Sequence, residues 1–439
     1  MLKLKEVIKI KRNRNLFMYM GGRFISLIGS GIQMMALPLY ILDLTGSGTL
    51  MGVFSMLTIV PALVTAPFSG IIGDRKNRRN VMIATDCVRG ALIILLGLLA
   101  MTKNLNLYIL FTLQVIISIM DSLFNSSSSA LMPDLISQDE LIQANSAKGG
   151  FDAASMILGP ALGGVIYGIW GIKMVFFING ISFIASAIFS ACIKYIKKTA
   201  EREKFSSNVF FSEITETLKF INSKRGLLQL FTFAMISNFL LAPTFDIIMP
   251  YALKKKIGFT SQQFGYIMCF FTIGILLGNI GLAAYFKKLT SKRLMQTGLI
   301  VESIITILMC ALVFPGVVKI YGGATILLFV SLTICCLGMG FFNAFVNTPI
   351  STNLQRLVPA DMRSRFFSIL GMFSQGAIPL GALLYGILLD LIPYYTLLTV
   401  INVLSIIVSG VFLVRACDEA YEAKNTDEAQ GGFSGEVTI

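Results

Sequence analysis

The sequence predicts an all-α membrane protein with twelve transmembrane helices in two six-helix halves. Three observations support this prediction. Of the 439 residues, 55% are hydrophobic and only 13% are charged, twelve apolar runs are long enough to cross a bilayer, and basic residues gather on one side of those runs. A soluble domain usually carries about 25% charged residues, so this composition excludes a soluble enzyme, a disulfide-rich secreted domain and a disordered chain.

The twelve apolar runs define the expected helices in order along the chain. A helix satisfies its own backbone hydrogen bonds, which lipid requires of a spanning segment. The first run is too long for the core of a signal peptide, so the basic residues before it are expected to form a retained tail. The runs lie at about 16–43, 48–70, 80–101, 106–130, 143–168, 174–193, 227–252, 264–286, 294–315, 324–350, 366–389 and 394–415.

The distribution of basic residues predicts the orientation. If the N-terminal tail is cytoplasmic, 28 Lys and Arg residues fall on the inner side of the membrane, six on the outer side, and two, Arg23 and Arg89, inside apolar runs. This bias predicts a multi-pass protein of a bacterial-type cytoplasmic (inner) membrane with both termini in the cytoplasm. It also accounts for the net charge of +13 without nucleic acid as a partner. The run Lys254–Lys256, on the outer side, departs from the trend.

A long polar interval divides the chain. We expect an N-terminal half at 1–193, a cytoplasmic linker at 194–226, a C-terminal half at 227–416 and a disordered acidic tail at 417–439. The segments 125–146 and 347–368 share five identities in 22 positions, as a parallel repeat of six spans would. Apolar linker residues at helical spacing predict an amphipathic helix on the inner membrane surface, namely Phe210, Ile214, Leu218 and Ile221.

The residue inventory excludes several kinds of chemistry. With no histidine in the chain, there can be no histidine-based triad, imidazole metal site or histidine proton relay. The seven cysteines are scattered without zinc-like spacing, and no phosphate-binding G-x-x-x-x-G-K-[ST] loop occurs. We therefore expect no enzyme, no cofactor, no metal and no direct use of ATP. Any transported proton must be held by a carboxylate.

The loop between the second and third runs contains the most specific motif. It resembles the G-x-L-A-D-R-x-G-R-R signature of the major facilitator superfamily, with Asn77 in place of a glycine. The resemblance implies the major facilitator fold. The alternative, a basic membrane anchor, explains the arginines but not the two glycines and the aspartate. The loop reads Gly70-Ile71-Ile72-Gly73-Asp74-Arg75-Lys76-Asn77-Arg78-Arg79.

The same resemblance implies a latch between the halves. In it, Asp74 caps the start of a helix in the other half. The loop arginines pair with a carboxylate near the end of the fourth span, for which Asp134 is the candidate. The arginines concerned are Arg75, Arg78 and Arg79.

The fifth run contains Gly159-Pro160-Ala161-Leu162-Gly163-Gly164, which resembles the G-P-x-x-G-G element of the antiporter branch of that superfamily. Pro160 kinks the helix, while Gly159 and Gly163 permit close helix contact. Helix packing without a coupling role is the alternative. The segments ALMPDLISQDELIQANS and QRLVPADMRSRFFS resemble the macrolide-efflux and siderophore-exporter branch.

Charges inside the spans are costly unless they are paired or wetted, so they mark candidate sites. Arg23, Asp86, Arg89 and Asp121 reach one depth, and Asp86 and Arg89 share a helix face at i and i+3. Asp152 is a further candidate for this layer. A closed cluster that only holds the N-terminal half together is the alternative.

Glu302 differs because no basic residue lies within its own helix turn. A buried carboxylate without a partner can bind and release a proton near neutral pH. Our hypothesis is that protons from outside neutralise Asp121 or Glu302 and thereby favour one of two access states. The basic residue that the family often has in the fourth span is absent from 106–130. Two alternatives follow, namely proton coupling through Arg23 or Arg89 and coupling to a different ion.

These features together predict a monomeric secondary transporter that exports amphipathic small molecules, macrolide-like drugs among them, by proton antiport with alternating access. The alternatives are a nutrient importer or facilitator of the same fold and a lipid-handling or sensory membrane protein. The expected partners are the cargo, protons and the lipid bilayer. Polar candidates for the cavity are Gln33, Asn238, Asn343, Asn347 and Gln375.

Overall fold

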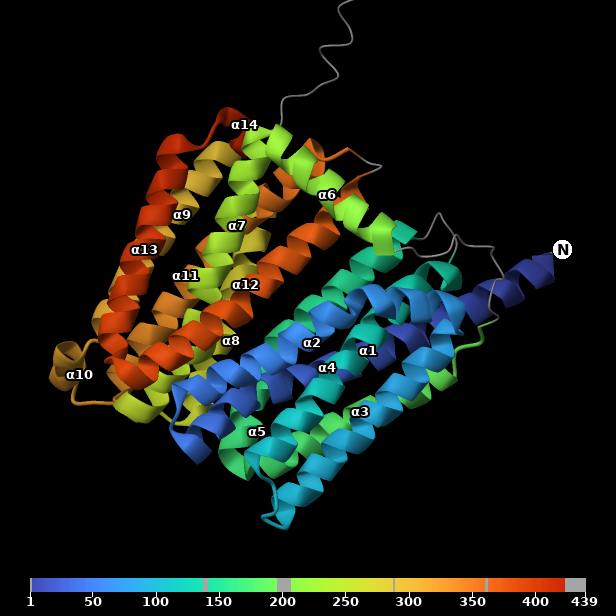
Figure 1. The fold of residues 1–439 in the computed structure, drawn as a ribbon, viewed down its shortest axis with the longest axis horizontal. Helices are drawn as coiled ribbons and strands as arrows, with labels where there is room; N and C mark the ends of the chain where they lie inside the picture. Colours follow the sequence, from blue (N-terminus) through green and yellow to red (C-terminus); the bar gives the residue numbers. More distant parts are fainter. Residues whose placement is uncertain (1, 137–140, 196–206, 287–288, 360–361, 423–439) are drawn as a thin grey trace, which may run out of the picture.

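The computed structural model describes residues 2–136, 141–195, 207–286, 289–359 and 362–422, and every regular element within these ranges is a helix (Figure 1). Side chains are described from Arg14 onward, except at 70–75 and at positions next to the gaps. Within these described ranges, eleven helical segments are long and apolar enough to cross a membrane. One of them spans 45 residues and contains two passes, which confirms the twelve predicted spans.

The N-terminal half consists of five long helices. Helices α3 and α4 begin where the side chains of Asn77 and Asn106 accept hydrogen bonds from the backbone of the first turn. Helix α5 turns back on itself at Gly171, whose φ of 72° favours glycine. The bounds are α1 Leu2–Thr45, α2 Gly48–Arg75, α3 Arg78–Met101, α4 Leu107–Leu135 and α5 Leu141–Ala191.

The C-terminal half begins after α6. A capping box between Thr260 and Gln263 starts α8, and the seventh span contains two π-helical segments, η2 and η3, each of which follows a proline. The short α10 is an element that hydropathy did not predict. The bounds are α6 Ser207–Ser223, α7 Arg225–Pro243, η2 Thr244–Ile248, η3 Tyr251–Ile257, α8 Ser261–Ala284, α9 Ser291–Leu312, α10 Pro315–Tyr321, α11 Ile326–Leu357, α12 Arg363–Leu391, α13 Tyr394–Arg415 and α14 Asp418–Tyr421.

The same helix pairings recur in the two halves. In the N-terminal half α1 packs against α5, α2 against α4 and α3 against α5, and in the C-terminal half α7 packs against α12, α8 against α11 and α9 against α13. Because α5 contains the fifth and the sixth span, each half pairs its first span with its fifth, its second with its fourth and its third with its sixth. This is the agreement that a parallel repeat predicts. Between the halves, α2 lies beside α12 and α5 beside α8 (Figure 1).

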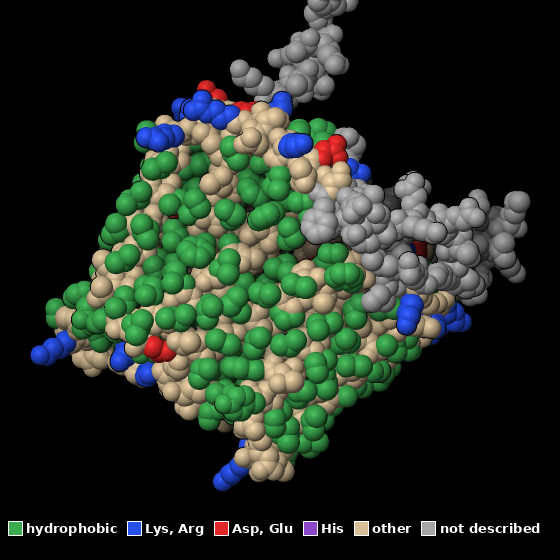
Figure 2. Space-filling model, viewed as in Figure 1, with side chains coloured by type: hydrophobic (Ala, Val, Ile, Leu, Met, Phe, Trp, Pro, Cys, Tyr) green, Lys and Arg blue, Asp and Glu red, His purple; other side chains and the backbone are tan. Residues whose placement is uncertain are grey.

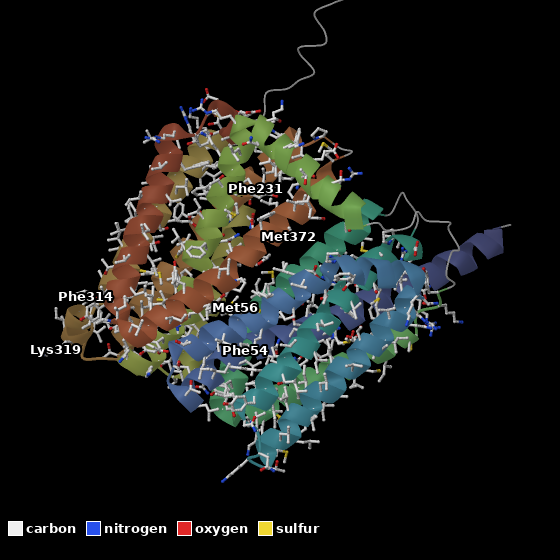
Figure 3. The ribbon with its side chains drawn as sticks, viewed as in Figure 1. Phe54, Met56, Phe231, Phe314, Lys319 and Met372 are labelled. Atoms are coloured by element: carbon white, nitrogen blue, oxygen red, sulfur yellow. The ribbon has the colours of Figure 1, made fainter. Side chains whose placement is uncertain are left out.

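Hydrophobic side chains cover the visible outer surface, and Lys and Arg side chains lie toward its edges (Figure 2). One edge includes the 75–78 turn, α6 and α14, and we call it the termini side. The other edge, which includes the 45–48 and 391–394 turns and α10, we call the far side. In Figure 3, Phe314 and Lys319 mark the far side at α10. This distribution of side chains is what a bilayer around the bundle requires.

The linker and the tail pack more closely than expected. Thr217 and Ile221 of α6 are buried, and Ile221 joins the apolar cluster of the C-terminal half. The tail is not disordered from its start, because α14 buries Tyr421 against Phe412, with 5.7 Å between ring centroids. Hydrogen bonds add to this contact, because Gly226 N–H donates to the Glu419 carboxylate at 3.0 Å and Asn353 Nδ2 donates to the carbonyl oxygens of Glu419 and Ala420, each at 2.9 Å. Residues 423–439 of the predicted tail lie outside the described residues.

The two halves make backbone contact on the far side. A Cβ added to Gly164 would lie 2.6 Å from the Cα of Gly265, and one added to Gly48 would lie 2.8 Å from the carbonyl oxygen of Gly386. Near the termini side, a Cβ at Gly149 of α5 or at Gly371 of α12 would meet nothing within 4 Å. The glycine-mediated backbone contacts between the halves, among the described residues, therefore lie on the far side.

Candidate functional site

A cavity of about 840 Å³ lies between the two halves. Helices α1 and α5 form one wall, and α7, η2, α8, α9, α11 and α13 form the other. Half of the lining residues have apolar side chains, and Met34, Met156 and Phe271 are examples. The polar lining residues with charged or amide side chains are Arg23, Asp152, Asn238, Asp246, Glu302, Asn343, Asn347 and Asn402.

Three of the five predicted polar cavity residues, Asn238, Asn343 and Asn347, line this cavity. Gln33 does not, because it turns into the N-terminal half, where its Oε1 accepts a hydrogen bond of 2.7 Å from Asn179 Nδ2. Gln375 is also absent from the described lining. Asn402 was not singled out from the sequence, although a lone amide in the most apolar span was a usable signal.

The C-terminal wall holds a carboxylate without an ion-pair partner. Among the described residues, no Lys or Arg forms an ion pair with Glu302, and its buried Oε1 has no hydrogen-bond partner. Asn343 offers its side-chain amide to this carboxylate, and Asn347 Nδ2 donates to Asn343 Oδ1 at 2.8 Å. In this wall, two hydrogen-bonded asparagine amides therefore lead to the carboxylate of Glu302.

The N-terminal wall holds a paired charge. Arg23 Nε and Nη2 donate to the two carboxylate oxygens of Asp152 at 2.9 and 3.1 Å, and Lys148 Nζ lies 3.2 Å from Asp152 Oδ2. Both Arg23 and Asp152 line the cavity. Such a bidentate pair is rigid and ties α1 to α5.

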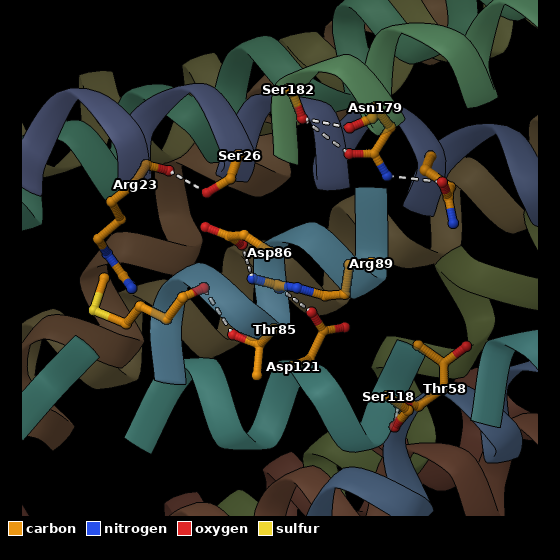
Figure 4. Close-up of polar contacts among 12 residues, drawn as sticks. Arg23, Ser26, Thr58, Thr85, Asp86, Arg89, Ser118, Asp121, Asn179 and Ser182 are labelled. Atoms are coloured by element: carbon orange, nitrogen blue, oxygen red, sulfur yellow. Dashed lines mark hydrogen bonds and ion pairs between the residues drawn. The ribbon is translucent and has the colours of Figure 1, made fainter. Parts of the chain in front are cut away.

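Asp86, Arg89 and Asp121 form a separate cluster (Figure 4). Arg89 bridges Asp86 of its own helix and Asp121 of α4, and its guanidinium lies 4.4 Å from the ring centroid of Phe124 and 4.2 Å from that of Phe183. Arg89 and Asp86 are buried, whereas the Asp121 side chain is 36% exposed. None of the three lines the described cavity. For Asp86 and Arg89 this geometry matches the closed-cluster alternative.

The loop arginines find partners within the N-terminal half. Arg78 Nη1 lies 2.6 Å from Asp134 Oδ2, and Arg79 Nη1 donates to the carbonyl of Ile193 at 2.9 Å. The Tyr195 hydroxyl also donates to Asp134, at 2.9 Å, and burial raises the pKa of Tyr195, so the phenol stays protonated. Contacts of Gly70, Gly73, Asp74 and Arg75 lie outside what the structure describes, so the predicted latch of Asp74 stays a prediction.

The glycines of the fifth span serve two interfaces. A Cβ at Gly159 would lie 2.7 Å from the Cα of Gly31, and one at Gly163 would lie 2.7 Å from the carbonyl oxygen of Ile32. These two glycines thus bring α1 against α5. Gly164, on another face, meets Gly265 of the other half, and Pro160 lines the cavity.

A cavity between two repeated halves of a membrane-spanning helical bundle is an arrangement typical of membrane transporters. The model of the Major Facilitator Superfamily matches residues 19–250 and again residues 231–435. The chain belongs to this superfamily.

Known relatives agree with this assignment. The chain is 23% identical over 369 residues to macrolide efflux protein A of Streptococcus pyogenes, which covers 84% of this chain and 88% of the relative. It is 20% identical over 398 residues to the staphyloferrin A transporter of Staphylococcus aureus, covering 90% and 94% of the two chains. Its fold is similar, with a TM-score of 0.69 and 15% identity, to a bacterial homologue of the iron transporter ferroportin in an inward-facing state, covering 92% and 98%. The chain thus resembles the drug and siderophore exporter branch.

Proposed function

We propose that this protein exports amphipathic small molecules, macrolide-like drugs among them, by proton antiport with alternating access. The termini side would face the cytoplasm and the protein would act as a monomer. The observation that supports the proposal most directly is Glu302, an acid with no described ion-pair partner, in the wall of a largely apolar cavity between the halves. The names of relatives such as macrolide efflux protein A support the substrate class.

The cavity suits such cargo in size and polarity. Ligand pockets usually have volumes of about 300–1,000 Å³ and apolar walls with a few polar groups, and the cavity of about 840 Å³ fits this description. The amides of Asn238, Asn343 and Asn347 offer hydrogen bonds to the polar groups of a large amphipathic molecule. Apolar side chains such as Met34 and Phe271 offer contact area without a fixed geometry.

Coupling would follow from a change of charge in the cavity wall. A deprotonated Glu302 attracts water and polar groups, whereas a protonated Glu302 tolerates a drier, closed wall. A proton that arrives from the far side would therefore favour closure around an emptied cavity and return to the cytoplasm-facing state. Asp121, partly exposed beside the Arg89 cluster, is the second candidate for this role.

The test is transport in vesicles of known orientation with an imposed proton gradient. Labelled macrolide, a lipophilic dye and a labelled phospholipid serve as separate substrates. We expect the macrolide or the dye to move against its gradient while protons move the other way, and a protonophore to abolish this movement. Movement of the phospholipid alone would favour a lipid-handling protein, and accumulation in whole cells that falls when the gradient collapses would favour an importer.

A further inference from the structure

The turn between α1 and α2, residues 45–48, is held by the C-terminal half. Asp390 of α12 accepts hydrogen bonds from the backbone N–H groups of Gly48 and Thr49, at 2.9 and 3.0 Å, and from the hydroxyl of Ser47 at 2.7 Å. The Ser47 hydroxyl oxygen in turn accepts from Leu50 N–H at 3.3 Å. The first two N–H groups of α2, those of Gly48 and Thr49, thus donate to a carboxylate from the other half.

Two lysines of η3 hold the other end of the same turn. Lys255 Nζ donates to the carbonyl oxygen of Gly46, directly after the end of α1, and Lys254 forms an ion pair with Asp43. Asp43 also accepts a hydrogen bond of 2.5 Å from the hydroxyl of Tyr167, over whose ring Lys254 lies at 5.0 Å from the centroid.

The signs of these charges match the two helix ends. The C-terminal end of a helix carries partial negative charge and its N-terminal end partial positive charge. The end of α1 meets ammonium groups and the start of α2 meets a carboxylate, and all three groups come from the C-terminal half. Around them the backbones touch, since a Cβ at Gly52 would lie 2.5 Å from the carbonyl oxygen of Ala382.

We propose that Asp390, Lys254 and Lys255 form a polar clasp that keeps the far side of the cavity shut. The clasp must release before the cavity opens to the far side, so its strength sets the balance between the two access states. The inference rests on the proposed alternating access. It also gives a role to the lysine run that departs from the positive-inside rule, because these lysines bind the other half instead of lining a cytoplasmic loop.

A distance measurement across the far side tests the clasp. Spin labels at Asn104 and Lys319, exposed residues on the far side of the two halves, report the separation in a chain whose seven free cysteines are replaced by alanine. We expect Asp390→Ala to raise the ratio of far-side-open to closed molecules about 5- to 30-fold, because it removes the partner of a helix N-terminus. Asp390→Asn keeps the acceptor oxygen and should have a smaller effect.

The double variant Lys254→Met/Lys255→Met removes the other arm of the clasp without touching Asp390, so it carries the test if Asp390→Ala fails to fold. The matched control is Lys292→Met, which breaks a Lys–Asp pair of 2.8 Å between α9 and Asp418 of α14, away from the far side. The control should leave the distances unchanged. Unchanged distances in both folded clasp variants would overturn the proposal. Because the measurement needs no substrate, an unmodified protein that fails to transport any compound would count against the proposed function and not against the clasp.

Discussion

Glu302 and Arg89 show two opposite ways in which this bundle holds a charge. Arg89 is enclosed by two carboxylates and two aromatic rings, so its charge is neutralised in place. Glu302 faces the cavity and, among the residues that the structure describes, has an amide neighbour in Asn343 and no ion-pair partner. The first arrangement stabilises one geometry. The second leaves the carboxylate able to respond to a proton or to cargo.

At Glu302 we expect Glu302→Gln to abolish gradient-driven transport while the protein still binds cargo. The amide keeps the shape of the side chain and cannot change its charge. Substrate flux in vesicles with and without a proton gradient measures the effect. Glu216→Gln, which changes an exposed carboxylate of α6 outside the cavity, is the control and should transport normally. Full gradient-driven activity in Glu302→Gln would shift the coupling role to Asp121 or to another ion.

At Arg89 we expect Arg89→Met to lower the free energy of unfolding by about 3–5 kcal/mol, the usual cost of leaving buried charges without their partner. Asp86, which is fully buried, would lose its ion pair. Thermal unfolding in detergent, followed by circular dichroism, measures the loss. A variant as stable as the unmodified protein would mean that the cluster contributes no net stability.

At the scale of elements, glycines decide how closely helices approach. Gly159 and Gly163 bring α1 against α5, and Gly164 brings α5 against α8. The sequence predicted close helix packing at these glycines but not which helices pack there. A glycine pattern shows that one face of a helix is flat, and it carries no information about the neighbouring helix. The sequence likewise did not predict where α6 and α14 pack, and in the structure both pack on the C-terminal half.

We expect Gly265→Val to hold α5 and α8 apart on the far side and to stop transport. A Cβ at Gly265 would lie 2.7 Å from the Cα of Gly164, which is too short for two non-bonded carbon atoms, so the two backbones would have to move apart. Gly410→Val on α13 is the matched control, because a Cβ there meets nothing within 4 Å. Vesicle flux of both variants, with expression checked in the membrane, decides the prediction. Normal flux in Gly265→Val would show that this contact is not needed for closure.

At the scale of the whole molecule, the surface defines how the protein sits in the bilayer. Hydrophobic side chains cover its visible outer face, and basic residues mark its edges (Figure 2). The excess of Lys and Arg on the termini side predicts that this side faces the cytoplasm. The far-side lysines Lys254 and Lys255 do not contradict this orientation, because they are engaged with the other half.

The orientation predicts which side chains a membrane-impermeant thiol reagent can reach. In the cysteine-free chain, a cysteine at Asn104 should react in intact cells, whereas a cysteine at Lys224, exposed on the termini side, should react only after permeabilisation. Labelling of single-cysteine variants with a maleimide measures both. The reverse pattern would invert the topology and, with it, the proposed direction of export.

The sequence by itself determined the number of spans, their order, the division into two halves and the residues that carry charge inside the membrane. These properties depend on hydrophobic length and on the cost of charge in lipid, which are local to each segment. Only the tertiary structure decided which charges pair. Arg23 pairs with Asp152 of α5, Arg89 pairs with Asp121 of α4, and Asp390 caps a helix more than three hundred residues away. The pair of Asp86 with Arg89 lies within one helix, so its i, i+3 spacing was already visible in the sequence. Partner choice depends on how distant helices cross, and no local pattern encodes a crossing.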